Sequence, residues 1–119
     1  MKNKSKLTGK NSNPIYQIKR NNMKSKPTED EIWAIIGLIK ISKARYRTLQ
    51  CLRNENLMPT EISKRTRLTP AQVSLALRDL KKLKIVRCMN ENVRKGRIYH
   101  CTQLGEHIME ILDETGYKP

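Results

Sequence analysis

A pair of helix starts separated by a very short turn, between residues 59 and 83, constrains the fold of this chain more than any other feature. Pro59 suits the first position of a short helix over residues 59–66, because proline lacks the backbone N–H that would be unpaired there. Thr69 then supplies a cap, and Pro70 a preset first turn, for a longer helix over residues 71–83. Only a few residues separate the helices, so the second must turn sharply away from the first.

The apolar residues of this helix pair fit such a crossing. Two helices that cross over a tight turn need an apolar contact from the first helix, a small residue at the crossing and apolar anchors on the second. The sequence supplies these in order with Ile62, Ser63, Leu68, Val73 and Ala76. The pattern therefore predicts a helix-turn-helix unit.

The second helix of the pair has an exposed face that the same geometry identifies. If Val73 points inward and each residue advances by about 100 degrees, Leu77 and Leu80 stay near the core. The outward stripe then consists of Ala71, Leu75, Arg78 and Lys82, with Gln72 and Ser74 at its flanks. We expect these side chains to be available to a partner, although an ordinary solvated helix face is the alternative.

Two short strands and three further helices complete the predicted domain. Residues 85–89 and 97–101 alternate in character around the polar stretch 90–96, as antiparallel strands do, with inward positions at Val86, Cys88, Tyr99 and Cys101. Capping residues and apolar periodicity predict helices over residues 28–41, 43–53 and 103–114. The predicted fold is mostly α with a small β-hairpin, a winged helix-turn-helix.

The charge of the chain indicates a polyanionic partner. Lys and Arg number 25 against 11 for Asp and Glu, which gives a net charge of +14. Nucleic acid is the first candidate and an acidic membrane surface the second. Residues 1–27 hold cations and no acids, so we expect a disordered basic arm there, followed by one folded domain over residues 28–119. The arm is either a solubility segment or a loose phosphate clamp.

Signals for a membrane or secreted protein are missing from this sequence. The longest apolar stretch, residues 32–39, is too short to span a bilayer. No apolar run with a cleavage site follows the basic N-terminus, so we expect a cytoplasmic protein.

The residues that carry metal or catalytic chemistry form no known pattern here. No Cys-x-x-Cys pair is present, so we interpret the three cysteines, Cys51, Cys88 and Cys101, as buried thiols. His100 and His107 with Cys101 supply too few ligands for a metal sensor. We therefore predict no enzyme, no metal or cofactor, and no small-molecule effector.

The exposed stripe of the second helix has the residue types that read DNA. Such a helix places its N-terminal part against base edges in the major groove. Gln pairs with adenine and Arg with guanine through two hydrogen bonds, so the base-reading candidates are Gln72, Ser74 and Arg78. Thymine methyl groups would be contacted by Ala71 and Leu75.

The hairpin tip carries a second set of candidate DNA contacts. Cations beside Gly96, namely Arg94, Lys95 and Arg97, are expected to contact phosphates or the adjacent minor groove. Together the predicted DNA-binding residues are Thr69, Ala71, Gln72, Ser74, Leu75, Arg78, Lys82, Arg94, Lys95 and Arg97.

Several pieces of the sequence match a known pattern when they are taken together. They are Ser42-Lys43-Ala44-Arg45, Pro59-Thr60-Glu61-Ile62-Ser63-Lys64-Arg65, Val73-Ser74 with Leu77 and Leu80, and Gly96-Arg97-Ile98-Tyr99 before Thr102. With them, residues 40–112 resemble the winged-helix regulators of the MarR and ArsR type, in an archaeal form. The resemblance implies a sequence-specific double-stranded DNA-binding transcription regulator. A winged-helix module that binds RNA or a protein complex is the alternative.

Two residues depart from the pattern of that family. Arg67 stands in the turn and Lys84 at the end of the second helix, where the family often has glycine. A left-handed backbone at either residue would cost on the order of 1 kcal/mol relative to glycine.

The helix over residues 28–41 is apolar on more than one side, which suggests two uses for its side chains. They either cover the core of their own domain or pair with a second subunit, and we favour the homodimer. The predicted dimerisation residues are Ile32, Trp33, Ile35, Ile36, Ile39, Ile108 and Ile111. A two-fold dimer would bind a palindromic operator.

Overall fold

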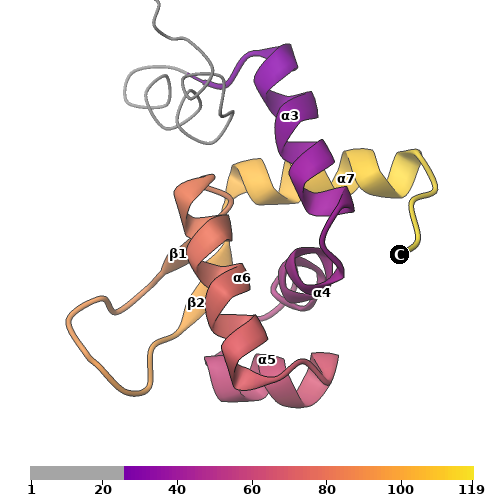
Figure 1. Cartoon of the computed structure of the whole chain (residues 1–119). Coiled ribbons are helices and arrows are strands. Elements are labelled where there is room, and N and C mark those ends of the chain that lie inside the picture. The colour runs from indigo at the N-terminus through magenta and orange to yellow at the C-terminus, as the bar shows by residue number, and fades with distance from the viewer. Residues whose placement is uncertain (1–25) are drawn as a thin grey trace, which may run out of the picture.

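The computed structural model describes residues 26–119, so the predicted basic arm lies outside the described residues except for Lys26 and Pro27. Figure 1 shows five helices and one two-stranded antiparallel hairpin in this part of the chain. In chain order they are α3 (Glu29–Lys40), α4 (Lys43–Cys51), α5 (Pro59–Thr66), α6 (Pro70–Lys82), β1 (Val86–Cys88), β2 (Tyr99–Cys101) and α7 (Gln103–Glu114). The predicted winged helix-turn-helix is confirmed, with strands shorter than expected and with α4 ending at Cys51.

The helix starts are capped by the residues that the sequence indicated. The Thr28 hydroxyl accepts the Glu31 N–H at 3.2 Å, and the Glu31 carboxylate accepts the Thr28 N–H at 2.7 Å. At the start of α7, the Thr102 hydroxyl accepts the Gly105 N–H at 3.1 Å. Pro59 is the first residue of α5, as predicted.

Both residues that replace glycine in the family pattern have the left-handed conformation. The φ angle is 64° at Arg67, after α5, and 65° at Lys84, after α6. The end of α6 has the two hydrogen bonds of a Schellman motif: Lys84 N–H donates to the Lys81 carbonyl at 3.0 Å, and Ile85 N–H donates to the Leu80 carbonyl at 3.2 Å. The chain therefore uses a glycine-type helix end with a lysine in the strained position.

The core lies where the faces of all five helices meet the inner side of the hairpin. The helix-turn-helix residues Ile62, Leu68, Val73 and Ala76 are buried, as predicted, and the Ser63 hydroxyl donates to the Leu68 carbonyl at 2.6 Å across the turn. The remaining core comes from α3, α4, α7 and the segment after α6, with fully buried Ile35, Ile39, Leu49, Leu83, Ile85 and Ile108. Burial of these side chains is the main term that holds α6 in place.

The hairpin packs its inner face on this core. Val86, Cys88 and Tyr99 are buried and Cys101 is half-buried, so the predicted inward positions are confirmed at the first three. A Cβ at Gly105 would overlap the carbonyl oxygen of Ile85 and the Cys101 sulfur, which shows how closely α7 approaches the hairpin. Glycine at this position is required by the contact, not by its backbone conformation.

A single residue acts as a third strand that the sequence analysis missed. Leu57, between α4 and α5, donates its N–H to the Tyr99 carbonyl at 3.0 Å and accepts the Tyr99 N–H at 2.8 Å. This bridge joins the outer side of β2 to the segment that leads into α5 and so fixes the hairpin relative to the helix pair.

The helices lie at opposite ends of the domain. In Figure 1, α3 and α7 lie at one end and α5 at the other, with α4 between them, and the hairpin loop extends to the side of α6. Among the helices of residues 26–119, none combines the length and the apolar composition needed to cross a bilayer.

Candidate nucleic-acid interface

The outward stripe of α6 is presented to solvent. Every predicted residue of this helix and its cap lies on the exposed side: Thr69, Ala71, Gln72, Ser74, Leu75, Arg78 and Lys82. The opposite face, with Val73, Ala76, Leu77 and Leu80, is buried in the core. Leu75 leaves 51% of its surface exposed in the middle of the stripe. An exposed leucine between polar neighbours is suited to a partner that offers methyl groups as well as hydrogen bonds.

Gln72 has a structural task that the sequence analysis did not assign. Its side-chain oxygen accepts the Thr69 N–H at 2.9 Å, while the Thr69 hydroxyl accepts the Gln72 N–H at 3.1 Å. This capping box uses one of the two lone pairs of the Gln72 side-chain oxygen, and a two-bond contact with adenine would need the other. Base reading by Gln72 stays a prediction, with the side chain held at the start of α6 by its capping bond.

The hairpin loop is pinned by its own side chains. The Asn90 side chain accepts the Ile98 N–H at 2.8 Å and donates to the Gly96 carbonyl at 3.0 Å, which ties the two sides of the loop together. Arg97 donates to the Val93 carbonyl at 2.7 Å and to the Glu91 carbonyl at 3.2 Å. Arg97 was predicted to contact phosphates, but its guanidinium is engaged inside the loop, so the freely presented cations of the tip are Arg94 and Lys95.

An ion pair connects the hairpin loop to α6. Lys81 Nζ lies 2.9 Å from the Glu91 carboxylate, and an Arg97 nitrogen lies 3.9 Å from the same carboxylate. The hydrogen bond from Lys81 lowers the pKa of Glu91, so the carboxylate keeps its charge at neutral pH. The pair is exposed and adds little to stability, but it joins the two elements that flank the groove.

A groove of about 490 Å³ lies between α6 and the hairpin. Five of the side chains that line it are cationic, and among its described lining residues none is acidic: Arg78, Lys81, Lys82, Lys84 and Arg97. Lys81 and Lys84 were not in the predicted set. Helical periodicity alone places Lys81 at the side of the stripe, and no local sequence signal places the hairpin against that side.

Ion pairing distinguishes two groups of cations in the described part of the chain. One group holds the fold together: Arg45 bonds Asp79 at 3.2 Å and the Leu38 carbonyl at 2.7 Å, and Arg53 bonds Asp113 at 2.8 Å. The other group belongs to none of the ion pairs of residues 26–119 and includes Arg78, Lys82, Arg94 and Lys95. Unpaired cations also lie elsewhere in residues 26–119, for example Lys43 and Arg47 on α4, so α6 and the hairpin tip carry a part of the unneutralised charge that attracts a polyanion.

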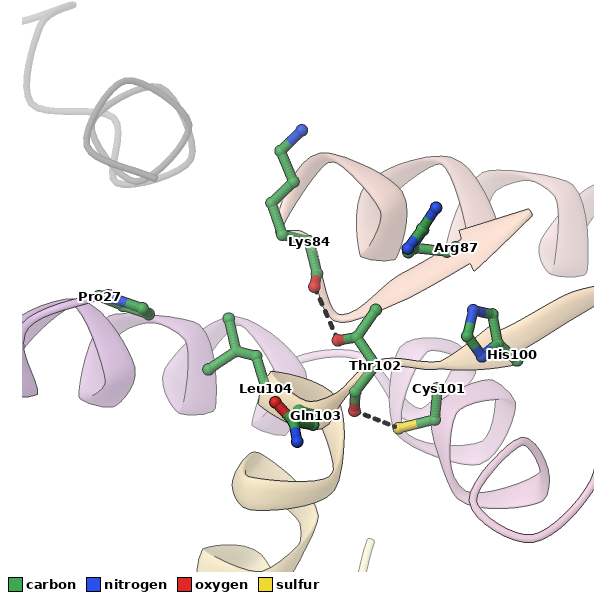
Figure 2. Close-up of a pocket in the computed structure, with 8 residues that line it drawn as sticks. All are labelled: Pro27, Lys84, Arg87, His100, Cys101, Thr102, Gln103 and Leu104. Atoms are coloured by element: carbon green, nitrogen blue, oxygen red, sulfur yellow. Dashed lines mark hydrogen bonds between the residues drawn. The ribbon is translucent and has the colours of Figure 1, made fainter. Parts of the chain in front are cut away.

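A second concavity, of about 700 Å³, lies at the base of the hairpin. Figure 2 shows Arg87 on β1 and His100 on β2, with Lys84 nearby and Thr102 below Lys84. The Thr102 hydroxyl donates to the Lys84 carbonyl at 2.8 Å, which attaches the end of α6 to the start of α7. Lys84 lines both concavities, so positive charge continues from the groove onto the outer face of the hairpin.

The cysteines and histidines do not form a reactive centre in the described residues. Burial raises the pKa of the Cys51 thiol to about 11 and that of Cys101 to about 12, so both thiols stay protonated at neutral pH. Cys88 is buried, whereas Cys51 and Cys101 are half-buried, so the expectation of buried thiols holds fully at one position. Residues 26–119 bring together no group of His, Cys, Asp and Glu that could hold a metal ion.

The predicted dimerisation residues divide between the core and the surface. Ile35, Ile36, Ile39 and Ile108 are buried in the core of their own domain, so they cannot form the surface of an interface, contrary to expectation. Ile32 and Ile111 are partly exposed, and Trp33 has 49% of its surface exposed. Apolar periodicity identified the buried face of α3 and could not tell it from an interface.

Comparison with known proteins gives one informative result. No family model matches the chain, and no curated protein matches it. The structure is similar to that of TubR bound to 24 bp of tubC from Bacillus thuringiensis serovar israelensis pBtoxis, with a TM-score of 0.63 and 19% sequence identity. The similarity covers 76% of this chain and 99% of that chain. At this identity it establishes a shared winged-helix fold.

Proposed function

We propose that this protein binds specific sequences in double-stranded DNA and acts as a transcription regulator. The observation that carries the proposal is the groove between α6 and the hairpin, which is lined by five cations, two of which, Lys81 and Arg97, also pair with Glu91. A polyanion with a regular groove of its own fits such a surface. The similar fold of TubR, whose structure was solved bound to DNA, supports the same conclusion.

In the proposed complex, α6 enters the major groove. Arg78 pairs with guanine, Ser74 donates to or accepts from a neighbouring base, and Leu75 contacts a thymine methyl group. Gln72 keeps its capping bond and offers its NH2 group to a base edge. Arg94 and Lys95 at the hairpin tip contact phosphates or the adjacent minor groove, and Lys81, Lys82 and Lys84 contact the phosphates that pass between them.

We further propose that the protein is a homodimer in the cytoplasm and that its operator is palindromic. Two symmetry-related α6 helices would then bind half-sites about one helical turn apart. The resemblance to MarR- and ArsR-type regulators, including an archaeal origin, stays a prediction.

Selection of bound duplexes from a random DNA library, with the full-length protein, tests the proposal. We expect an enriched palindromic motif, and we expect Arg78→Ala to lose or relax preference at one base pair per half-site, at a cost of about 1–3 kcal/mol. The matched control is Arg87→Ala, which removes the same charge from an exposed position outside the groove. The Arg87→Ala variant should enrich the same motif as the wild type.

Two outcomes would contradict the proposal. The absence of any enriched sequence at moderate salt would contradict sequence-specific DNA binding, and it would favour a module that binds RNA or a protein complex. Equal loss of the motif in both arginine variants would show that net charge, and not the α6 stripe, determines recognition.

A further inference from the structure

The outward face of α3 carries an apolar stripe that residues 26–119 leave exposed. Trp33 has 49% of its surface exposed and Ile41, at the end of the helix, has 77% exposed, with exposed Gly37 midway between them. The stripe lies opposite the buried Ile35 and Ile39, since residues four apart share a face of a helix. The helix that carries the stripe lies at the end of the domain away from α5 (Figure 1).

Gly37 has no explanation inside its own domain. A glycine in the interior of a helix costs about 1 kcal/mol relative to alanine. A Cβ added at Gly37 would meet nothing within 4 Å, so no contact with the described residues requires a glycine there. A missing side chain on an exposed helix face makes a notch, and such notches let a second helix approach closely.

We propose that a second copy of this chain packs its α3 antiparallel against this stripe. The two-fold axis passes between Trp33 and Gly37, so that each Trp33 ring fills the notch above the partner's Gly37. Trp33 and Gly37 are one helical turn apart on the same face, which makes the stripe complementary to itself under a two-fold rotation. A large aromatic ring over a glycine is the type of contact that anchors an interface.

Charge supports the antiparallel direction. The pairing that places Trp33 on the partner's Gly37 also places Asp30 opposite the partner's Lys40, and both side chains are exposed on the same face. Asp30 belongs to none of the ion pairs within residues 26–119. The acidic first turn of one α3 would meet the basic last turn of the other, and the helix dipoles would oppose. A parallel pair would instead bring like charges together.

The proposed contact deepens the homodimer part of the proposed function and gives that dimer an interface. A single helix pair buries less than the roughly 1,200 Å² of a standard interface. We therefore expect a dimer that dissociates on dilution and that two adjacent half-sites would hold together.

The only tryptophan of the chain lies in the proposed contact and reports on it directly. In a dilution series of the full-length protein without DNA, Trp33 emission should shift to longer wavelength as sedimentation equilibrium shows dimers separating. Gly37→Leu fills the notch and should weaken the dimer at least about tenfold, since overpacking at a tight contact is costly. Thr60→Leu adds the same side chain to the exposed surface of α5 and should leave the dimer unchanged.

Charge reversal tests the direction of the helices. Asp30→Lys alone brings lysine opposite the partner's Lys40, and Lys40→Asp alone brings aspartate opposite the partner's Asp30, so each variant should dimerise at least roughly tenfold more weakly. A mixture of the two variants pairs opposite charges at both ends and should form a heterodimer. Near-UV circular dichroism of each variant checks its fold.

Failure of the mixture to associate, with both variants folded, would overturn the antiparallel pairing. Trp33 emission that does not change while the protein dissociates would place the interface elsewhere. Because these measurements contain no DNA, a monomer that still selects a DNA motif would refute the α3 contact alone. A dimer without DNA binding would refute the proposed function alone.

Discussion

The left-handed Lys84 at the end of α6 allows stability and DNA binding to be separated by two substitutions at one position. Lys84→Gly removes both the strain and the groove cation, whereas Lys84→Ala removes the cation and keeps the strain. A non-glycine residue at φ 65° costs about 1–2 kcal/mol, and glycine loses about 0.5–1 kcal/mol more backbone entropy on folding. We therefore expect Lys84→Gly to be more stable than the wild type by about 0.5–1 kcal/mol.

Urea unfolding followed by circular dichroism measures the stability of both variants. For a domain of this size, the expected increase in the unfolding free energy of Lys84→Gly corresponds to a rise in Tm of about 2–8 °C in thermal unfolding. Lys84→Ala should unfold close to the wild type. Both variants should bind DNA more weakly, and the slope of log affinity against log salt should fall by about 0.9 in each, since one phosphate contact is lost.

Equal unfolding free energies for the two variants would refute the strain argument. They would mean that the Schellman hydrogen bonds, not the missing glycine, determine the stability of this helix end. Unchanged DNA affinity in both variants would remove Lys84 from the interface without affecting the strain argument.

Three further predictions concern the core and the thiols. Gly105→Ala should destabilise the fold by about 1–3 kcal/mol, because its Cβ overlaps the Ile85 carbonyl; a urea midpoint equal to that of the wild type would contradict the contact. Thr48 is buried and its hydroxyl has no hydrogen-bond partner in the described residues, so Thr48→Val should raise the unfolding free energy by about 1 kcal/mol in the same assay. Burial raises the pKa of Cys101 from about 9 to about 12, so its contribution to stability is complete below pH 9 and is lost as pH rises toward 12. Cys101→Ala should flatten the fall in unfolding free energy between these pH values, and an unchanged slope would show that the thiol ionises normally.

Much of the fold follows from local sequence signals, because each of them acts within a few residues. Pro59 and the Thr69-Pro70 pair place the starts of α5 and α6, and Thr102 places the start of α7. The Leu57 bridge could not be predicted, because it is a pairing of one residue with Tyr99 and has no alternation of its own. The close approach of Gly105 to Ile85 is likewise a contact between distant segments that no local pattern encodes.

The candidate site was predictable where it depends on helical periodicity and not where it depends on side-chain hydrogen bonds. Periodicity from Val73 identified the exposed stripe of α6 correctly. It could not show that the Gln72 amide is used in capping, or that Arg97 bonds to carbonyls of its own loop. The same limit applies to α3, where apolar residues that fill the core and those that remain exposed have similar sequence patterns.

The hairpin loop is held by its own hydrogen bonds, which bears on whether the protein or the DNA changes shape on binding. The bonds of Asn90 and Arg97 and the link from Glu91 to Lys81 order the loop before any partner arrives. A loop that is already ordered loses little conformational entropy on association, so less of the interaction energy is consumed by folding it. An ordered loop also keeps its conformation on binding, so the DNA duplex must deform to reach a close fit. We therefore expect affinity to vary with the flexibility of base steps beneath the hairpin tip, at positions where no side chain reads a base.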